Sequence, residues 1–334
     1  MRPLVSILIP AYNAEQWIGQ TLRSAVNQDY PHKEIILVDD GSTDRTLEVA
    51  KTFASASVKI VHQSNAGGPA ARNQALSYAQ GNYIQWLDHD DLLAPNKISV
   101  QLREQDQNDR VLYSCPFATF YYRTEKAQLF QSPLCRNLRP LEYFFIKFSG
   151  NTYFQSSSWL VSRKLTDLAG PWCEFRSADD DGEYFSRVVA ASEKIWFVPE
   201  ARCYWRVGNH GSFSGAWKKS AAVQDATFQS MRRCVELFRK MEDSASSRAA
   251  CVKFLQDRFG YFYPENQELV HQMQALAHEL GGELSPPSFS WKYQWINLFF
   301  GTHAAKRAQL FFPSLRSRAE CKWDKLMYDR SGGK

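Results

Sequence analysis

The chain has 334 residues, of which 44% are hydrophobic, and a formal net charge of +5 at pH 7. This length is enough for one large domain or two smaller ones, and the apolar fraction argues against a largely disordered chain. A charge this small does not indicate a nucleic-acid partner. The seven cysteines are scattered and never spaced as Cys-x-x-Cys, which argues against a zinc site or a disulfide framework and indicates free thiols in a reducing compartment.

Short apolar runs alternate with segments of helical periodicity over the first hundred residues. The runs have the length of buried strands, and the first intervening segment spaces its apolar residues as a helix does. The sequence therefore predicts strands at 4–10, 34–40, 58–63 and 83–87, and helices at 14–28, 45–54 and 68–79. Buried strands that alternate with helices indicate an α/β fold with a mostly parallel sheet covered on both faces.

The pattern changes twice after residue 110. We expect strands at 111–122, 156–162, 194–199 and 202–207 with a helix near 141–148, and then only helices, at 218–241, 246–259 and 267–280. A break at 281–288 precedes a basic, aromatic tail. These changes predict a first domain at 1–215 and a C-terminal helical extension at 216–334.

The sequence contains no run that predicts a signal peptide or a membrane span. The apolar run at 3–12 is too short for a signal core followed by a cleavage site, and the longest later run, 295–300, cannot cross a bilayer. We therefore expect a cytoplasmic protein, either soluble or peripheral on the inner face of the membrane.

Carboxylates gather where strands are expected to end. They form three groups: Asp39 and Asp40; Asp88, Asp90 and Asp91; and Asp179, Asp180, Asp181 and Glu183. In an open parallel sheet, ligands bind beyond the carboxyl ends of the strands. Like charges this close require a compensating cation, and a hard divalent ion that carries a diphosphate would supply it. The chain has neither of the common glycine-rich phosphate loops, so a metal would take over their work.

Four segments carry a resemblance to a known family. In chain order they are VSILIPAYNAE, EIILVDDGSTDRT, NAGGPAARNQAL and GNYIQWLDHDDLLAP. Together they resemble the nucleotide-binding half of bacterial family-2 inverting glycosyltransferases of GT-A fold, a Rossmann-like fold for nucleotide-diphospho-sugars. The resemblance resumes at DDDGEYFSR and thins out beyond about residue 215. It implies a catalytic domain with a nucleotide-binding half at 1–110 and an acceptor half at 111–215.

The resemblance implies roles at the donor site. Pro10 and Tyr12 stand where the family forms the wall of the uridine pocket. Asp40 stands where a carboxylate, which only accepts hydrogen bonds when ionised, takes the N3–H of uracil. Asn65 and Arg72 stand at positions that help to hold the nucleotide. The implied donor is a UDP-sugar.

The resemblance also implies a metal site. Asp88 would meet the ribose or a metal-bound water, and Asp90 would ligate Mn²⁺ or Mg²⁺. The segment CYWRVGNHGSFS resembles the family's Arg-x-x-x-His loop. Its Arg206 and His210 would therefore reach the diphosphate or the metal.

The acidic segment after residue 178 resembles the family's Glu-Asp motif, which is followed by a helix with an arginine some six residues on. Arg187 matches that arginine, which sets Asp180 against the glutamate and Asp181 against the aspartate. Asp181 would then be the general base and Asp180 an acceptor contact. The register with Asp180 as the base stays open.

The implied activity is transfer of a hexosyl or N-acetylhexosaminyl group to a glycan or lipid-linked acceptor in polysaccharide or cell-envelope biosynthesis. A nucleotidyltransferase shares the sheet and the carboxylate chemistry, but its first loop is usually glycine-rich and basic, unlike PAYNAEQW. A glycosidase also uses paired carboxylates but has no reason for a nucleotide-type sheet. A catalytically inactive relative would instead serve as a binding module in a polysaccharide assembly complex.

The tail that begins at Trp291 combines aromatic and basic residues. Between Trp291 and Lys325 the only acids are Glu320 and Asp324. Two interpretations stay open. The tail helices lie in the membrane interface with their basic residues toward an anionic leaflet, or their aromatic residues pack on the catalytic domain as a cover.

Overall fold

The structure is a computed structural model that describes residues 2–103, 108–208, 220–287 and 290–332. Its central sheet has five strands in the order β3-β2-β1-β4-β9, and all neighbours are parallel except the last pair. The strands are β1 (Val5–Ala11), β2 (Lys33–Asp40), β3 (Val58–Gln63), β4 (Tyr83–Trp86) and β9 (Val161–Ser162). This mostly parallel sheet confirms the predicted α/β fold.

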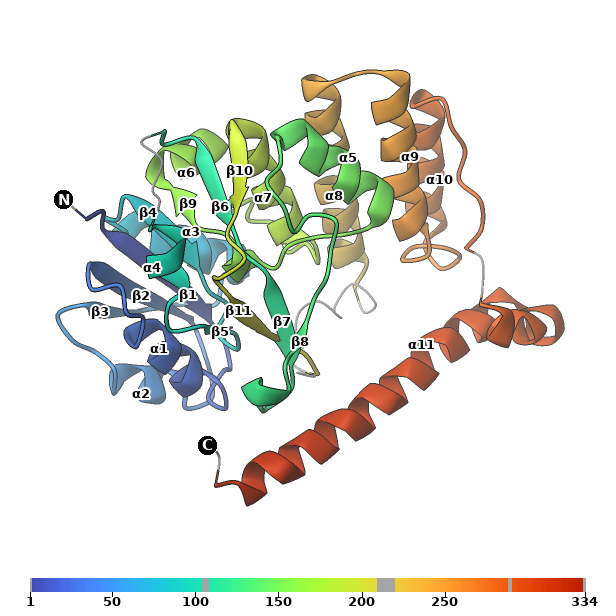
Figure 1. The fold of residues 1–334 in the computed structure, drawn as a ribbon. Helices are drawn as coiled ribbons and strands as arrows, with labels where there is room; N and C mark the ends of the chain where they lie inside the picture. Colours follow the sequence, from blue (N-terminus) through green and yellow to red (C-terminus); the bar gives the residue numbers. More distant parts are fainter. Residues whose placement is uncertain (1, 104–107, 209–219, 288–289, 333–334) are drawn as a thin grey trace.

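Helices connect the parallel strands and cover the sheet. α1 (Ile18–Val26) packs on α2 (Thr46–Lys51), while α3 (Gly68–Tyr78) lies against β1 and β2 on the opposite face (Figure 1). Strand β1 is buried along its whole length. Burial on both faces explains why this strand is apolar at every position except Ser6 rather than alternating between apolar and polar residues.

Two smaller sheets extend the fold beyond β4. β6 (Val111–Ser114) pairs in parallel with β10 (Lys194–Phe197). The other sheet has the order β5-β11-β7-β8 and consists of β5 (Leu92–Leu93), β11 (Cys203–Arg206), β7 (Phe117–Phe120) and β8 (Gln128–Leu129). Two short helices, α4 (Lys97–Gln101) and η1 (Thr124–Lys126), lie in the connections. Because β5 follows the acidic loop after β4, its pairing with β11 fixes one end of that loop.

Two predicted strands are wrong in extent. The strand expected at 111–122 is divided between β6 and β7, which belong to different sheets. Pro116 lies in the break, where its missing N–H cannot continue a ladder. The strand expected at 156–162 is reduced to β9, because η2 (Ser156–Ser158) precedes it. There the side chain of Gln155 accepts a hydrogen bond from the Ser157 N–H and turns the backbone.

The rest of the chain is mostly helical, as predicted. α5 (Pro140–Gly150), α6 (Arg163–Ala169) and α7 (Asp180–Ala191) belong to the mixed part, and α8 (Ala221–Met241), α9 (Ala245–Phe259) and α10 (Gln267–Glu279) follow. α8 packs on α7 and α9 packs on α5, with the rings of Phe148 and Phe254 stacked 4.2 Å apart. The predicted domain boundary at residue 215 lies outside the described residues.

The tail, α11 (Trp291–Arg330), consists of two helices that meet at a kink at Gly301, where φ is 79°, and the longer one extends away from the helical bundle (Figure 1). Its last part returns to the first half of the chain, where Asp324 accepts hydrogen bonds from the backbone and side chain of Arg123. Most large aromatic residues of α11 are exposed, including Trp291 at 77% and Phe299 at 73%, whereas Tyr328 is half-buried, with its ring centroid 5.8 Å from that of Tyr122. For the exposed residues, the interpretation that they form a packed cover is therefore wrong. Among the described residues, no helix has the length and apolarity needed to cross a membrane.

Candidate active site

One buried arginine joins the two acidic clusters. Arg72, in the first half of α3, donates from Nη2 to Asp88 Oδ1 and from Nη1 to Asp180 Oδ2, both at 2.9 Å. Asp88 follows β4, whereas Asp180 opens α7, more than ninety residues later. The guanidinium also lies over the ring of Trp172, 4.5 Å from its centroid. The sequence placed Arg72 beside the nucleotide, and the structure places it between the carboxylates.

Burial and the neighbouring charges have opposite effects on the pKa values of Arg72 and Asp180. Burial disfavours the charge of Arg72, but the fields of Asp180 and Asp88 raise its pKa. Burial likewise raises the pKa of Asp180, and Arg72 opposes that rise. The arginine thus places its positive charge between two partly buried carboxylates and limits the rise in the pKa of Asp180.

The loop between β4 and β5 holds the predicted metal ligands. Asp91 is 1% exposed and accepts hydrogen bonds from the backbone N–H of Arg206 at 2.8 Å and from Gln155 Nε2 at 2.5 Å. Burial, followed by the charges of Asp90 and Asp88, raises the pKa of Asp91 well above its usual value. Asp88 and Asp90 remain partly exposed. Asp91 is therefore the structural member of this group, and Asp88 and Asp90 are the members that a ligand can reach.

Arg206 is buried and holds the acidic loop in place through its hydrogen bonds. Its side chain is 3% exposed and donates to the carbonyl oxygens of Asp90 and Tyr121 and to Gln20 Oε1 at 2.7–2.8 Å. The guanidinium also lies 4.0 Å from the centroid of the Trp17 ring. This arrangement fixes the acidic loop and does not favour the predicted contact of Arg206 with a diphosphate. The other member of that predicted pair, His210, lies outside the described residues.

Asp40 organises the loop that follows β3. Its carboxylate accepts hydrogen bonds from the backbone N–H groups of Ala66 and Gly67, both at 2.8 Å, and from Gln63 Nε2 at 2.7 Å. An ionised carboxylate has about four lone-pair sites, so these three donors leave one unoccupied on a residue that is 2% exposed. Gly41, at φ 71°, allows the close approach of this loop, since a Cβ there would lie 2.7 Å from the Asn65 nitrogen.

The other predicted donor-site residues surround this loop. Asn65 is exposed, donates to the Asp40 carbonyl oxygen at 2.9 Å and accepts from Arg176 Nη2 at 2.7 Å. Pro10 is buried within β1, and Tyr12 follows the strand with 45% of its surface exposed. The exposed ring of Tyr12 and the rim residue Asn65 are thus accessible to a ligand at the carboxyl edge of the sheet.

Asp181 has the most perturbed environment of the predicted catalytic pair. Its Oδ1 accepts from the Gly182 N–H at 2.8 Å and its Oδ2 from Ser156 Oγ at 3.4 Å. Burial, followed by the charges of Asp180, Asp179 and Asp88, raises the pKa of Asp181 to about 7. A carboxylate with a pKa near the working pH is suited to accept a proton.

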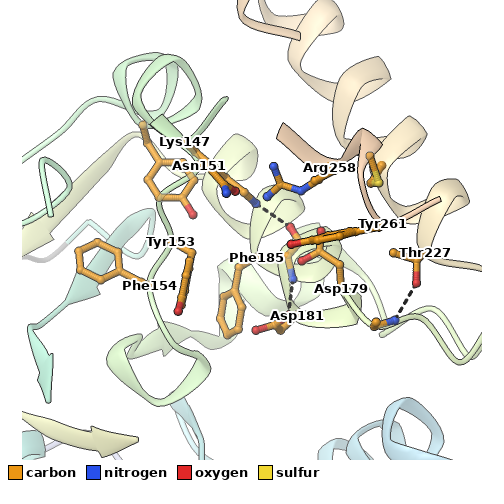
Figure 2. Close-up of a pocket in the computed structure, with 14 residues that line it drawn as sticks. Lys147, Asn151, Tyr153, Phe154, Asp179, Asp181, Phe185, Thr227, Arg258 and Tyr261 are labelled. Carbon is orange, nitrogen blue, oxygen red and sulfur yellow. Dashed lines mark hydrogen bonds between the residues drawn. The ribbon is translucent and has the colours of Figure 1, made fainter. Parts of the chain in front are cut away.

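A cavity of about 330 Å³ lies against Asp181, on the side of the C-terminal helices (Figure 2). Residues from α5, α7, α8 and the end of α9 form its walls. Figure 2 shows Asp181 at one end of the cavity, with Tyr153, Tyr261 and Arg258 around it. Asp180 instead turns to Arg72, so only Asp181 of the predicted catalytic pair borders this space.

Sequence reasoning missed several residues that shape the site. Gln155 bonds Asp91 and approaches Asp88 at 3.5 Å, Trp172 supports Arg72, and Arg258 lines the cavity. They lie outside the segments that carry the resemblance, and no local pattern distinguishes them from core or surface residues. Arg187, which set the register of the acidic motif, forms a two-pronged ion pair with Glu183 at 2.9 Å.

The residues after β4 fit a divalent cation that shares its coordination with phosphate. Carboxylate oxygens are the donors that Mg²⁺ and Mn²⁺ prefer, and Mg²⁺ sites often have one or two carboxylates with water and phosphate as the other ligands. Asp88 and Asp90 offer that donor set. Where the chain is described, no group of three or more metal-binding side chains is present. Burial is the main cause of the raised pKa of Asp91, and the charges of Asp90 and Asp88 add to it, so a cation at these two carboxylates would offset part of the rise.

Comparison with known proteins finds a family model that matches the first half of the chain. Residues 6–167, just under half of the chain, match the family model described as Glycosyl transferase family 2. An uncharacterized glycosyltransferase of Haemophilus influenzae is 42% identical over 113 residues, which are 33% of this chain and 45% of the relative. The matched segment therefore spans less than half the length of that relative.

Solved structures show the same fold over most of the chain. The structure of Staphylococcus aureus TarS 1–349 in complex with UDP-GlcNAc aligns with a TM-score of 0.62 and 20% identity, over 83% of this chain and 80% of that one. The mannosyltransferase PcManGT from Pyrobaculum calidifontis, in complex with GDP-Man and Mn²⁺, aligns with a TM-score of 0.52 and 18% identity, over 97% and 85%. At these identities the comparison shows the GT-A fold.

Proposed function

We propose that this chain, whose residues 6–167 are a glycosyltransferase family 2 domain in a GT-A fold, moves a sugar from a UDP-sugar to a hydroxyl of a glycan or lipid-linked acceptor. The observation that carries the proposal is the bridge from Asp88 through Arg72 to Asp180, with Asp181 beside it on a cavity. This bridge brings the carboxyl edge of the donor sheet to the start of α7. A donor at that edge and an acceptor in the cavity would meet at Asp181.

The donor would lie along the carboxyl ends of β1, β2 and β4. Asp40 has one acceptor site left for the imide N–H of a uracil, and the exposed ring of Tyr12 would face the base. Support for a uridine nucleotide comes from the similar fold solved with UDP-GlcNAc, although a second similar fold contains GDP-Man. Asn65, which anchors the loop after β3, would border the nucleotide.

The chemistry assigned to Asp181 is proton abstraction. Its carboxylate takes the proton of the acceptor hydroxyl as that oxygen attacks the anomeric carbon and the bond to the nucleoside diphosphate breaks. A single displacement of this kind inverts the anomeric centre, so an α-linked donor gives a β-linked product. Asp180 holds Arg72 and thereby keeps the start of α7 at the donor edge. Much of the rate gain would come from holding the two reactants in line.

Asp88 and Asp90 would hold a divalent cation at the β4 edge. When bound, such an ion neutralises the charge that develops on the leaving diphosphate. Support comes from the donor set described above and from the similar fold solved with Mn²⁺. Asp91 would hold the loop in shape through Gln155 and the backbone of Arg206, without contacting the ion.

The exposed surface of α11 supports a peripheral membrane contact. Trp291, Leu298 and Phe299 each leave more than seven-tenths of their surface exposed. Exposed basic residues, including Arg307 and Arg318, share the helix with them. A helix with exposed aromatic and basic residues is suited to the interface of an anionic bilayer, which would bring the enzyme to lipid-linked acceptors.

The direct test is a panel of nucleotide sugars, each assayed for release of nucleoside diphosphate with and without Mn²⁺. We expect one UDP-sugar to be turned over in the presence of the metal and an acceptor extract. Release of pyrophosphate from a nucleoside triphosphate and a sugar phosphate would indicate a nucleotidyltransferase instead. Saturable nucleotide binding with no turnover of any donor would indicate an inactive binding module.

A further inference from the structure

The cavity beside Asp181 has the size and walls of a small-ligand site. Its volume of about 330 Å³ is at the lower end of the range of about 300–1,000 Å³ for such sites, which are mostly apolar with a few polar groups. Aromatic rings form much of its wall, among them Tyr153, Phe154, Phe185 and Tyr261 (Figure 2). Tyr153 and Tyr261 leave 40% and 37% of their surface exposed, so a ligand can reach both.

Arg258 brings a positive charge to this cavity without an acidic partner. It lies in the last turn of α9, is half-buried, and packs its guanidinium over the Phe254 ring at 3.9 Å. Its hydrogen bond to the Phe254 carbonyl oxygen is 3.5 Å long and therefore weak. In the parts of the chain that the structure describes, it forms no ion pair. Other arginines of the helical bundle, such as Arg232 and Arg239, each pair with a carboxylate.

A second cation lines the same cavity. Lys147, on α5, is 4% exposed and donates to the Gly182 carbonyl oxygen and to Ser186 Oγ, both at 3.0 Å. Both of these acceptors are neutral, so its charge is not cancelled by them. Asp179 and Asp181 also line the cavity, but within the described residues neither forms an ion pair with Lys147 or Arg258. Because Lys147 is buried and already donates to its two neutral acceptors, the positive charge that an entering anion can reach is that of Arg258.

The phenol of Tyr153 adds a neutral hydrogen-bond donor close to the base. Burial, followed by the charge of Asp181, raises the pKa of Tyr153, so its hydroxyl stays protonated at neutral pH. The ring packs at a tilt against Phe130, with the centroids 5.6 Å apart, which holds it in place. A sugar ring that lies on an aromatic face uses its apolar C–H face, while its hydroxyls remain free for donors and acceptors at the rim.

We propose that this cavity is an acceptor subsite for an acidic saccharide, in which Arg258 binds a carboxylate or phosphate of the sugar and Tyr153 supports its ring. A guanidinium presents a planar fork of N–H groups that fits either anion. The acceptor hydroxyl would then face Asp181 at the other end of the cavity. The assignment as an acceptor subsite rests on the proposed glycosyltransferase function. The anion site itself does not, because it is defined by the residues of the cavity.

The test measures binding of three probes to the full chain without any nucleotide. The probes are methyl β-glucuronide, methyl β-glucoside 6-phosphate and neutral methyl β-glucoside, and the readout is the dissociation constant from NMR titration. Because hydrogen bonds to charged groups are the stronger ones, we expect at least one anionic probe to bind about 10- to 100-fold more tightly than the neutral one. The anionic probe that binds more tightly identifies its charged group, the carboxylate or the phosphate, as the group that the site recognises.

Two variants locate the effect. Arg258→Gln should reduce the affinity for the anionic probe to that for the neutral probe and leave the neutral probe unchanged. The matched control Arg232→Gln removes an exposed, paired arginine from the same bundle and should change nothing. Arg258→Lys, which keeps the charge and loses the fork, should fall between wild type and Arg258→Gln. Matching thermal melts of all variants would exclude loss of folding.

The outcomes separate this proposal from the proposed function. Equal affinities for neutral and anionic probes in the wild type, no saturable binding of either anionic probe, or a preference that survives Arg258→Gln would overturn the anion site. Selective anion binding in a protein that turns over no nucleotide sugar would instead overturn the proposed function and leave the anion site standing.

Discussion

Arg72→Met is the perturbation that most directly probes the bridge between the two halves of the site. It removes two charge-assisted hydrogen bonds of 2.9 Å, to Asp88 and Asp180, and leaves both carboxylates without their cation. The arginine side chain is only 11% exposed, whereas Asp88 and Asp180 are 28% and 20% exposed. Removing one partner of a buried pair costs roughly 3–5 kcal/mol, and the water contact of the carboxylates places this case near 3 kcal/mol at about pH 8.

The loss of stability should depend on pH with a definite sign. Burial raises the pKa values of Asp180 and Asp181 above their unfolded values, and Arg72 opposes this rise. Without Arg72 these folded-state pKa values rise further. A carboxyl whose folded pKa lies above its unfolded pKa destabilises the fold at high pH, and the penalty disappears as the pH falls toward the unfolded value. The variant should therefore lose less stability at about pH 5 than at about pH 8.

Urea denaturation of the wild type and the variant at these two pH values measures the effect. The matched control is Arg232→Met, which breaks a half-exposed ion pair with Glu236 and should cost at most about 1 kcal/mol at either pH. A loss for Arg72→Met no larger than that of the control, or one that grows toward acid pH, would refute the bridging role.

Three further predictions concern the metal, the base and the tail. Asp90→Ala should abolish sugar transfer while the thermal melt stays unchanged, because a partly exposed loop carboxylate contributes little packing. EDTA should also abolish transfer, and full activity in EDTA would contradict the metal site. Because the base must be deprotonated, kcat/KM should fall about tenfold per pH unit below a pKa near 7, in line with the raised pKa of Asp181. A flat pH profile of kcat/KM down to about pH 5 would contradict the assignment of Asp181 as the base. The chain should pellet with anionic liposomes, because basic residues near an anionic leaflet contribute about 1 kcal/mol each. The pelleted fraction should fall at high salt and after Arg307, Arg318 and Lys322 become Gln. Equal pelleting with neutral and anionic vesicles, or none with either, would contradict membrane contact.

The strands of the central sheet were predictable where both faces of the strand are buried. β1, β2 and β4 are covered on both faces, so each has a mostly apolar run of strand length, interrupted only by the buried polar residues Ser6 in β1 and Gln85 in β4. The run at 111–122 is equally apolar, but its division between two sheets depends on strand partners far along the chain. Local pattern carries no information about those partners. Pro116 is the one local signal that would have separated β6 from β7.

The site was predictable in composition and less so in geometry. The sequence indicates which carboxylates follow the strands, but the contact between Arg72 and Asp180 joins residues 108 positions apart. The burial of Arg206 follows from Trp17 and Tyr121, which come from separate elements. The exposure of Trp291 and Phe299 was also not predictable, because apolar residues at helical spacing are more often buried in a core.

The comparison of Asp181→Asn with Asp180→Asn tests the central claim, that Asp181 is the base of this transferase. With the identified donor and acceptor, Asp181→Asn should lower kcat by roughly 10²–10⁴-fold, the usual contribution of a general base, and leave nucleotide affinity nearly intact. Asp180→Asn should weaken the bond to Arg72 and act mainly on the KM for the acceptor. An inactive Asp180→Asn beside an active Asp181→Asn would contradict the account and assign the base to Asp180.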